Sequence, residues 1–215
     1  MAPSADFGDL DPIFLREGHL CADTLHVVGE DFAALLAAAQ GGSDEAFAAL
    51  WRDTNPALLR YLRVLTPEHA EDVAAETWVQ VVRGLPRFTG DETAWRAWLF
   101  TTARRRAIDQ ARQLMRRPTT SLETQSDLAL AELPDLRSPD AADLALANLG
   151  TRTAIAVVAQ LPPLQAEVIM LRVVAGLDTE TVAQLLGRSP GAIRVAAHRG
   201  LHRLAGLLAE AGVTR

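Results

Sequence analysis

A chain of 215 residues can form one large domain or two small ones, each with its own buried core. Aromatic residues make up only 5% of it, and strand-type alternation of Val, Ile, Thr and Tyr is absent, so we expect an all-α protein. The single cysteine, Cys21, excludes an intramolecular disulfide and a multi-cysteine metal site. The sequence shows no signal peptide and no apolar run long enough to cross a bilayer, which predicts a cytoplasmic protein without membrane insertion.

Acidic residues crowd the start of the chain. Residues 1–31 carry seven acids and one arginine, a net charge of −6, which equals the net charge of the whole chain. We therefore expect residues 1–30 to form an acidic N-terminal extension. It is either a solvated, mobile segment or a tail that covers a basic surface and weakens nucleic-acid binding. His19, Cys21 and His26 lack a fourth ligand, so no metal site is predicted.

Two helices are predicted next. Ser43 is a typical N-cap, and the helix that it starts continues toward Leu65, with a kink or break at Pro56. Thr66 is expected to cap a second helix whose first residue is Pro67. The second helix has an apolar stripe for the core, made of Ala70, Val73, Ala74, Thr77, Trp78 and Val81. Its outward side is acidic.

A basic helix follows the short loop Arg87–Glu92. Its predicted core stripe is Trp95, Trp98, Leu99, Ala103, Ala107, Ala111 and Leu114. We expect both tryptophans in the core rather than stacked on bases. From Arg104 to Arg117 the chain has six arginines and one acid, a local net charge of +5. Taken alone, this face is either a solvated helix surface or a nucleic-acid contact.

Pro, Ser, Thr and acidic residues dominate 118–143, which we interpret as an extended acidic linker. Helical periodicity resumes at Leu144. Asp178 is the expected N-cap of one further helix, Gly187 its left-handed stop, and Ser189 with Pro190 the start of the last helix. The expected inward side of that helix is Ile193, Ala197, Leu201, Leu204 and Leu208.

The last two helices have the spacing of a helix-turn-helix. Four arginines and no acid lie between Arg188 and Arg203, and a generic surface helix would mix both signs. The second helix of this motif enters the DNA major groove, where arginine binds guanine or phosphate. His198 and His202 have the spacing of helical metal ligands, but no third ligand completes a site, so contact with DNA is favoured. The outward residues are Arg194, Val195, His198, Arg199, His202 and Arg203.

With both basic helices placed, the chain resembles a bacterial RNA polymerase sigma factor of the extracytoplasmic-function (ECF) type, within the sigma-70 family. The most specific motifs are Ala70-Glu-Asp-Val-Ala-Ala-Glu-Thr-Trp, Ala94-Trp-Arg-Ala-Trp-Leu-Phe and Leu161-Pro-Pro-Leu-Gln-Ala-Glu-Val. The resemblance implies two small helical domains, sigma region 2 at 31–117 and sigma region 4 at 144–215, joined by the linker. It implies a transcription initiation factor, with no enzyme activity, no catalytic residue, no cofactor and no metal.

The resemblance also implies roles for individual residues. Core polymerase, through the coiled coil of its largest subunit, would contact Glu71, Asp72, Glu76, Gln80 and Arg83, and its flap would contact region 4. The minus-ten element would be bound and melted by Arg87, Phe88, Thr89, Thr101, Arg104, Arg105, Asp109 and Arg112. The minus-thirty-five element would be bound by Arg188, Ser189, Arg194, Val195, His198, Arg199, His202 and Arg203. An anti-sigma protein would be a further partner, and whether it or the acidic extension inhibits the factor stays open.

Three positions depart from the family pattern. Arg105 replaces a common asparagine, Ala75 replaces a common glutamine on the polymerase-facing helix, and Ala196 stands where a DNA-contacting arginine is frequent. The alternative function is a stand-alone helix-turn-helix transcriptional regulator, which would need an upstream domain of alternating strands and helices. An enzyme acting on nucleic acid is disfavoured, because no phosphate-binding glycine loop or nucleophile motif is present.

Overall fold

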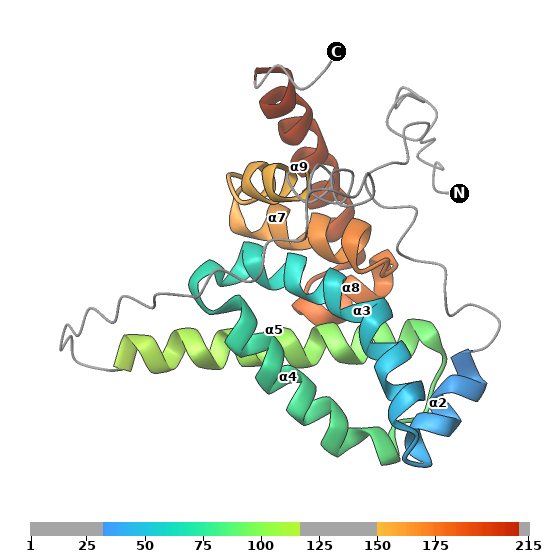
Figure 1. Ribbon diagram of the computed structural model, residues 1–215. Coiled ribbons are helices and arrows are strands. Elements are labelled where there is room, and N and C mark those ends of the chain that lie inside the picture. Colours follow the sequence, from blue (N-terminus) through green and yellow to red (C-terminus); the bar gives the residue numbers. More distant parts are fainter. Residues whose placement is uncertain (1–31, 117–149, 211–215) are drawn as a thin grey trace, which may run out of the picture.

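The computed structural model describes residues 32–116 and 150–210, and every regular element in these two ranges is a helix (Figure 1). The all-α prediction is confirmed. We call residues 32–116 the N-terminal bundle and residues 150–210 the C-terminal bundle. The predicted acidic extension and linker lie outside the described residues.

The N-terminal bundle contains helices α2 (Phe32–Gln40), α3 (Asp44–Leu65), α4 (Ala70–Gly84) and α5 (Glu92–Arg116), with short 3₁₀ turns η2 (Pro67–His69) and η3 (Leu85–Arg87). Helix α2 was not identified from the sequence, and it buries Phe32, Leu36 and Ala39. Ser43 caps α3 as predicted, since its Oγ accepts from the backbone N–H of Ala46 at 3.2 Å.

One predicted helix start is wrong, and the alternatives at Pro56 are narrowed. Helix α3 runs through Pro56 without a break, so of the predicted kink or break only a kink remains. Thr66 makes no side-chain capping bond, because Pro67 begins the 3₁₀ turn η2 rather than an α-helix, and α4 starts only at Ala70. Turns of this kind are frequent at the ends of α-helices and leave little trace in a hydrophobic pattern.

The core of the N-terminal bundle follows the predicted stripes over most of their length. All six residues of the α4 stripe are buried, and Trp95 of α5 is fully buried. The indole N–H of Trp78 donates to Asn55 Oδ1 at 2.9 Å, which satisfies a buried donor. The prediction is incomplete for Trp98, which packs against the core but is only half-buried.

The last turns of α5 do not continue the core. Ala111 is exposed and Leu114 is 45% exposed, so the predicted stripe ends at Ala107. Figure 1 shows this end of α5 projecting beyond the neighbouring helices. A periodic stripe indicates which face of a helix is apolar, but burial also requires a neighbour at that height.

The C-terminal bundle begins with a helical segment at 150–158. It continues with α7 (Pro163–Ile169), the π-helical turn η4 (Met170–Val174), α8 (Thr179–Leu186) and α9 (Pro190–Glu210). Asp178 Oδ1 accepts from the N–H of Thr181 at 2.7 Å, and this bond lowers the pKa of Asp178. Gly187 has φ 63°. The predicted helix-turn-helix boundaries are confirmed.

The inward side of α9 differs from the expectation. Ile193 is buried, but Leu201 is 37% exposed, and Gly200 lies inward in its place. A Cβ at Gly200 would lie 2.7 Å from Ile169 Cδ1 and 3.3 Å from Gln165 Cβ, so α7 packs closely against α9 at this position. Ala196 is also buried, at 6% exposure.

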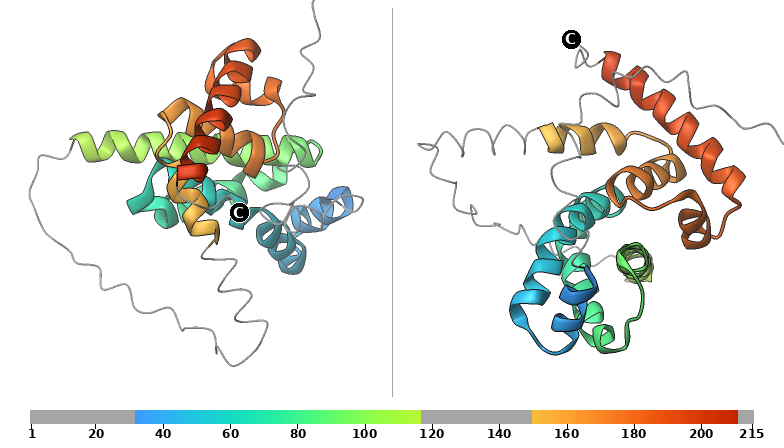
Figure 2. Two further views of the ribbon diagram at one scale, coloured as in Figure 1. Left: turned by 90° about the horizontal axis from the view of Figure 1, so that it is seen from above. Right: turned by 90° about the vertical axis from the view of Figure 1, so that its right-hand side faces the viewer.

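The two bundles contact each other. Helix α3 packs against α7 and η4, and α5 touches α8 (Figures 1 and 2). At this boundary the Glu167 Oε1 atom accepts from Arg104 Nε at 2.8 Å and from Tyr61 Oη at 3.0 Å. Tyr61 is fully buried and packs edge-on against Phe100, with ring centroids 5.3 Å apart. Burial, and secondarily the Glu167 carboxylate, raise the pKa of Tyr61 well above its ordinary value of 10.0.

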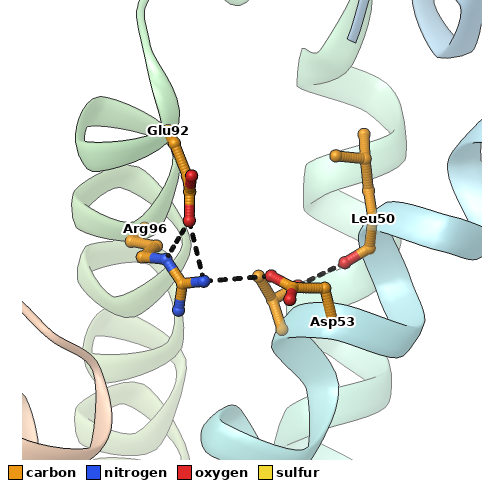
Figure 3. Close-up of polar contacts among 5 residues, drawn as sticks. Leu50, Asp53, Glu92 and Arg96 are labelled. Carbon is orange, nitrogen blue, oxygen red and sulfur yellow. Dashed lines mark hydrogen bonds and ion pairs between the residues drawn. The ribbon is translucent and has the colours of Figure 1, made fainter. Parts of the chain in front are cut away.

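A buried ion cluster orients α5 on α3 (Figure 3). Arg96 Nη2 donates to Asp53 Oδ2 at 3.0 Å and to Glu92 Oε1 at 2.9 Å. The side chains of Arg96 and Asp53 are only 8% and 5% exposed. Burial raises the pKa of Asp53, against the opposing effect of Arg96. Each charge is therefore costly unless the other is present.

Replacing Arg96 tests this cluster. Arg96→Met should lower the free energy of unfolding by about 3–5 kcal/mol, because it leaves the Asp53 carboxylate buried without its main partner. The double variant Arg96→Met, Asp53→Asn should recover part of this loss. Arg63→Gln breaks an exposed pair with Glu71 and should cost below about 1 kcal/mol. Urea unfolding measures all three, and equal losses for Arg96→Met and Arg63→Gln would contradict the prediction.

Tyr61 reports on the contact between the bundles, because it is the only tyrosine of the chain. In an alkaline titration followed by tyrosinate absorbance, native protein should ionise well above the midpoint of about 10 expected in denaturant. Since the folded-state pKa is the higher one, stability should begin to fall as the pH passes that ordinary value. Glu167→Gln should lower the native midpoint while burial keeps it raised.

The control for this titration is Glu180→Gln, which removes an exposed pair with Arg194 inside the C-terminal bundle. It should leave the Tyr61 midpoint unchanged. A native midpoint equal to that of the denatured chain would show that Tyr61 is not buried between the bundles in solution.

Candidate nucleic-acid and partner interfaces

Ion pairs involve some of the arginines on the basic face of α5 and not others. Arg105 is exposed and has no carboxylate partner among the described residues. Arg112 lies 3.9 Å from Asp109, and both side chains are at least half-exposed, so this pair is weak. Arg104 is held by Glu167, and Thr101 is half-buried. Of the residues predicted here, Arg105 and Arg112 therefore offer the most available charge.

The loop before α5 is held in place by a side chain from α2. The side-chain amide of Gln40, at the end of α2, donates to the carbonyls of Leu85 at 2.9 Å and Phe88 at 2.7 Å. Phe88 is half-buried and stacks on Trp98, with centroids 5.0 Å apart and an interplanar angle of 20°. Arg87 and Thr89 are exposed. Gln40 and the stacking of Phe88 on Trp98 therefore hold the loop in one position.

The outward face of α4 combines acids with apolar side chains. Glu71, Asp72 and Glu76 are exposed, as predicted from the stripe. Val79 and Val82 are 49% and 51% exposed, a feature that the sequence analysis did not note. An apolar pair beside three carboxylates fits a protein partner with a cationic rim and an apolar centre. Gln80 and Arg83 lie at the edge of this face, toward α5.

The predicted outward residues of α9 are all exposed. Four of them, His198, Arg199, His202 and Arg203, line a shallow hollow of about 350 Å³ together with Gln165 of α7. Arg194 pairs with Glu180 of α8 at 3.2 Å, with both side chains at least 60% exposed, so that α9 does have one acidic neighbour in space. Arg188 and Ser189 are exposed in the turn. The face is otherwise uniformly cationic or neutral.

Ala196 requires a correction. The family pattern suggested that its small side chain removes a DNA contact, but Ala196 is buried at 6% exposure. It faces the core of the C-terminal bundle instead of the outward face that holds Val195 and Arg199. Its departure from the pattern therefore concerns packing.

Several residues that shape these faces were missed. Glu167 is 63 residues from Arg104 and 106 from Tyr61, and Gln40 is 48 from Phe88. No local pattern marks such partners. The described residues contain no group of three or more His, Cys, Asp and Glu side chains able to hold a metal ion. In the same part of the chain, no helix is long and apolar enough to span a membrane.

Comparison with known proteins identifies both bundles. Residues 50–117 match the family model for sigma-70 region 2, and residues 152–204 match the model for sigma-70 region 4. The ECF RNA polymerase sigma factor ShbA of Streptomyces griseus is 34% identical over 181 residues, which covers 81% of this chain and 93% of that protein. SigD of Mycobacterium tuberculosis, another ECF sigma factor, is 32% identical and covers 86% and 87%.

Solved structures agree on the fold. CnrH, in complex with the cytosolic domain of CnrY, has a TM-score of 0.54 and 24% identity, with 82% of this chain and 96% of that chain covered. The sigma factor RpoE of Bartonella quintana, in complex with the anti-sigma factor NepR, has a TM-score of 0.52 and 22% identity, with 79% and 98% covered.

A region 2 match on the N-terminal bundle excludes the alternative of a stand-alone regulator, which has no such domain. The region 2 match precedes the region 4 match along the chain. The chain belongs to the ECF sigma factors, the promoter-directing subunits of bacterial RNA polymerase.

Proposed function

We propose that this sigma factor uses three separate faces during initiation. The acidic and valine-bearing face of α4 binds the coiled coil of the largest polymerase subunit. The basic face of α5, with the loop 88–91, binds and melts the minus-ten element. The exposed face of α9 reads the minus-thirty-five element, and the C-terminal bundle contacts the polymerase flap.

The observation that carries this proposal is the division of charge between the faces. Glu71, Asp72 and Glu76 are exposed on α4, whereas Arg105 on α5 and Arg199 and Arg203 on α9 are exposed and make no ion pair among the described residues. Neither basic face is needed to bury the core. A basic face on each bundle gives one chain two DNA contacts, as recognition of a two-part promoter requires.

Melting is assigned to α5 because of its neighbours. An opened strand is stabilised by cations along its backbone and by aromatic surfaces for its bases. Arg105 and Arg112 supply the first, and Phe88 with Trp98 supplies the second at the adjacent loop. The proposed role is binding and stabilisation of DNA, and no catalytic role is proposed for any residue.

Partners and domain limits follow from the same proposal. We assign region 2 to 31–117 and region 4 to 144–215, with the acidic segment 118–143 between them. Core polymerase and promoter DNA are the partners, and an anti-sigma protein that covers α4 and the basic helices would keep the factor inactive. The proposed site of action is the cytoplasm, where the polymerase lies.

The deciding experiment is reconstituted transcription with the full chain and bacterial core polymerase. The templates are DNA upstream of the gene for this protein and a library of genomic fragments from the same bacterium. We expect binding to core and initiation at discrete sites. A chain that neither binds core nor starts transcripts on any template would refute the proposed function.

Replacing Arg199 tests the α9 face. Arg199→Gln should weaken promoter binding by the reconstituted holoenzyme. If Arg199 holds a phosphate, the slope of log affinity against log salt should fall by about one. If it reads a base, the loss should be about 1–3 kcal/mol, with relaxed specificity at one position.

The matched control is Arg152→Gln, which removes one exposed arginine outside α9. It should change neither the affinity nor the salt slope by a comparable amount. If Arg199→Gln behaves like this control, the outward face of α9 is only a solvated surface.

A further inference from the structure

A groove between α4 and α5 carries positive charge that no acid of the described residues balances. Its volume is about 370 Å³, and it opens on the surface of the N-terminal bundle. Arg83, Arg105 and Arg106 line it, and no carboxylate does. These three arginines make no ion pair within the described residues, whereas Arg96 and Arg104 each have a carboxylate within 3.0 Å. The groove therefore suits a negatively charged ligand.

Arg106 supplies an independent indication of a ligand. Its Nε atom is buried and has no hydrogen-bond acceptor. An unsatisfied buried donor costs free energy, and the cost is larger on a charged group. A buried donor of this kind in a native protein calls for a specific explanation, such as an acceptor that a ligand brings. An anionic oxygen in the groove would satisfy this donor.

The wall beside the arginines is aromatic and fixed in position. A Cβ at Gly84 would lie 2.6 Å from Trp98 Cζ2, so the indole rests directly against the backbone of α4. Trp98 also stacks on Phe88 and makes an edge contact with Trp95, whose centroid is 5.6 Å away. It remains half-buried and lines the groove. A ligand that combines carboxylates with an aromatic side chain would fit both parts of this surface.

The chain itself contains a segment of this composition. Residues 1–31, which lie outside the described residues, have a net charge of −6, whereas the remaining 184 residues carry 20 acids and 20 arginines. Within the segment, residues 6–14 contain three acids and no basic residue, and apolar side chains alternate with the acids. The sequence of this part is Asp6-Phe7-Gly8-Asp9-Leu10-Asp11-Pro12-Ile13-Phe14.

The segment joins the N-terminal bundle close to the aromatic wall. Phe32, the first described residue, has its ring centroid 6.4 Å from that of Trp95, which in turn contacts Trp98. Two ring contacts thus separate the start of α2 from the groove. The chain between Phe14 and Phe32 spans up to about 60 Å when fully extended. Residues 6–14 can therefore reach the groove of their own chain.

We propose that residues 6–14 bind in the groove between α4 and α5 of the same chain. The carboxylates of this segment bind the guanidinium groups of Arg83, Arg105 and Arg106, and the Phe7 ring packs against Trp98. Arg105 belongs to the proposed DNA face of α5, so the bound segment competes with minus-ten DNA. This consequence rests on the proposed function and adds to it a form of inhibition within one chain.

The other acidic segment of the chain fits the groove less well. Residues 118–143 have a net charge of −5 but contain no aromatic residue that could pack on Trp98. They also follow the end of α5 at Arg116. Ten residues of helix, about 15 Å, separate Arg116 from Arg106. Composition and the point of attachment both favour residues 6–14.

The direct test is an NMR measurement on the full chain, without DNA or polymerase. With nitrogen-15 in the tryptophans, each indole N–H gives one signal, and Trp51, which is 40% exposed on α3 and outside the groove, serves as the internal reference. The triple variant Asp6→Asn, Asp9→Asn, Asp11→Asn should shift the Trp98 signal and leave that of Trp51 in place. In a chain that also carries Arg83→Gln, the same three changes should shift the Trp98 signal much less, because the contact is already weakened.

A matched control removes the same charge from the same segment. The triple variant Glu17→Gln, Asp23→Asn, Glu30→Gln also changes the net charge of the chain from −6 to −3. It should leave the Trp98 signal unchanged, since these acids lie outside residues 6–14. Arg83 is exposed on α4, so Arg83→Gln is expected to fold.

The regulatory consequence is measured by reconstituted transcription with limiting core polymerase. Tethering gives the segment an effective concentration of about 1 mM, so a docking Kd of about 100 µM would lower the available fraction of the factor roughly tenfold. The Asp6, Asp9, Asp11 variant should therefore reach half-maximal initiation at about a tenth of the wild-type concentration. The matched control should stay close to wild type.

Four results would overturn the proposal. Equal effects of the two triple variants would mean that only overall charge matters. A Trp98 signal that responds to Glu123→Gln, Asp127→Asn, Glu132→Gln instead would assign the groove to residues 118–143. A shift that disappears on dilution would mean that a second copy supplies the segment. A Trp98 signal insensitive to every variant would show that the groove holds no part of the chain.

The docking test and the test of the proposed function give separate answers. If the Trp98 signal responds as expected but the chain starts no transcripts on any template, the proposed function fails and the contact within the chain stands. If initiation is normal and the Trp98 signal does not respond, the docking of residues 6–14 is refuted alone.

Discussion

The relative placement of the two bundles depends on one carboxylate, that of Glu167, which accepts from both Arg104 and Tyr61. The ion pair itself is weak, since the Arg104 side chain is 29% exposed and solvent screens it. Tyr61 is fully buried and packs on Phe100 of the same bundle, so its hydroxyl is held in a fixed position for Glu167. The Arg104–Glu167 pair therefore contributes more to the alignment of the two bundles than to the strength of their contact. It also occupies Arg104 Nε, which cannot donate to a DNA phosphate while Glu167 holds it.

Inside the N-terminal bundle, the ion pair of Arg96 with Asp53 is buried, unlike the partly exposed pair of Arg104 with Glu167. Asp53 and Arg96 are almost completely buried, so neither charge is tolerable alone, and the pair orients α5 against α3. The basic residues on the outer side of α5 are presented at a constant angle because Arg96 is held from within. The same applies to the loop 88–91, which Gln40 fixes through two backbone carbonyls. Rigid support of this kind lowers the entropic cost of binding DNA.

Much of this fold could be predicted from the sequence, because its signals are local. Ser43, Asp178 and Ser189 cap helices as expected, and the α4 stripe is buried in full. The errors arise where burial depends on a distant neighbour. Leu114 lies on an apolar stripe yet is exposed, because the last turns of α5 extend beyond the other helices of the bundle. Leu201 is exposed because α7 packs against the neighbouring Gly200 instead. The groove between α4 and α5 could not be predicted for the same reason: Arg83 and Arg106 become neighbours only after folding.

Arg105 connects the departure from the family pattern with the geometry of the site. The family pattern that the sequence resembles has asparagine here, and the amide of asparagine can both donate to and accept from a base edge. A guanidinium group cannot accept a hydrogen bond, and its charge attracts every phosphate regardless of sequence. Here Arg105 shares a groove with Arg83 and Arg106, so it adds to an existing cationic cluster. In the proposed minus-ten contact, the exchange would add backbone affinity and would replace an amide that reads adenine with a guanidinium group that can read only the acceptors of guanine.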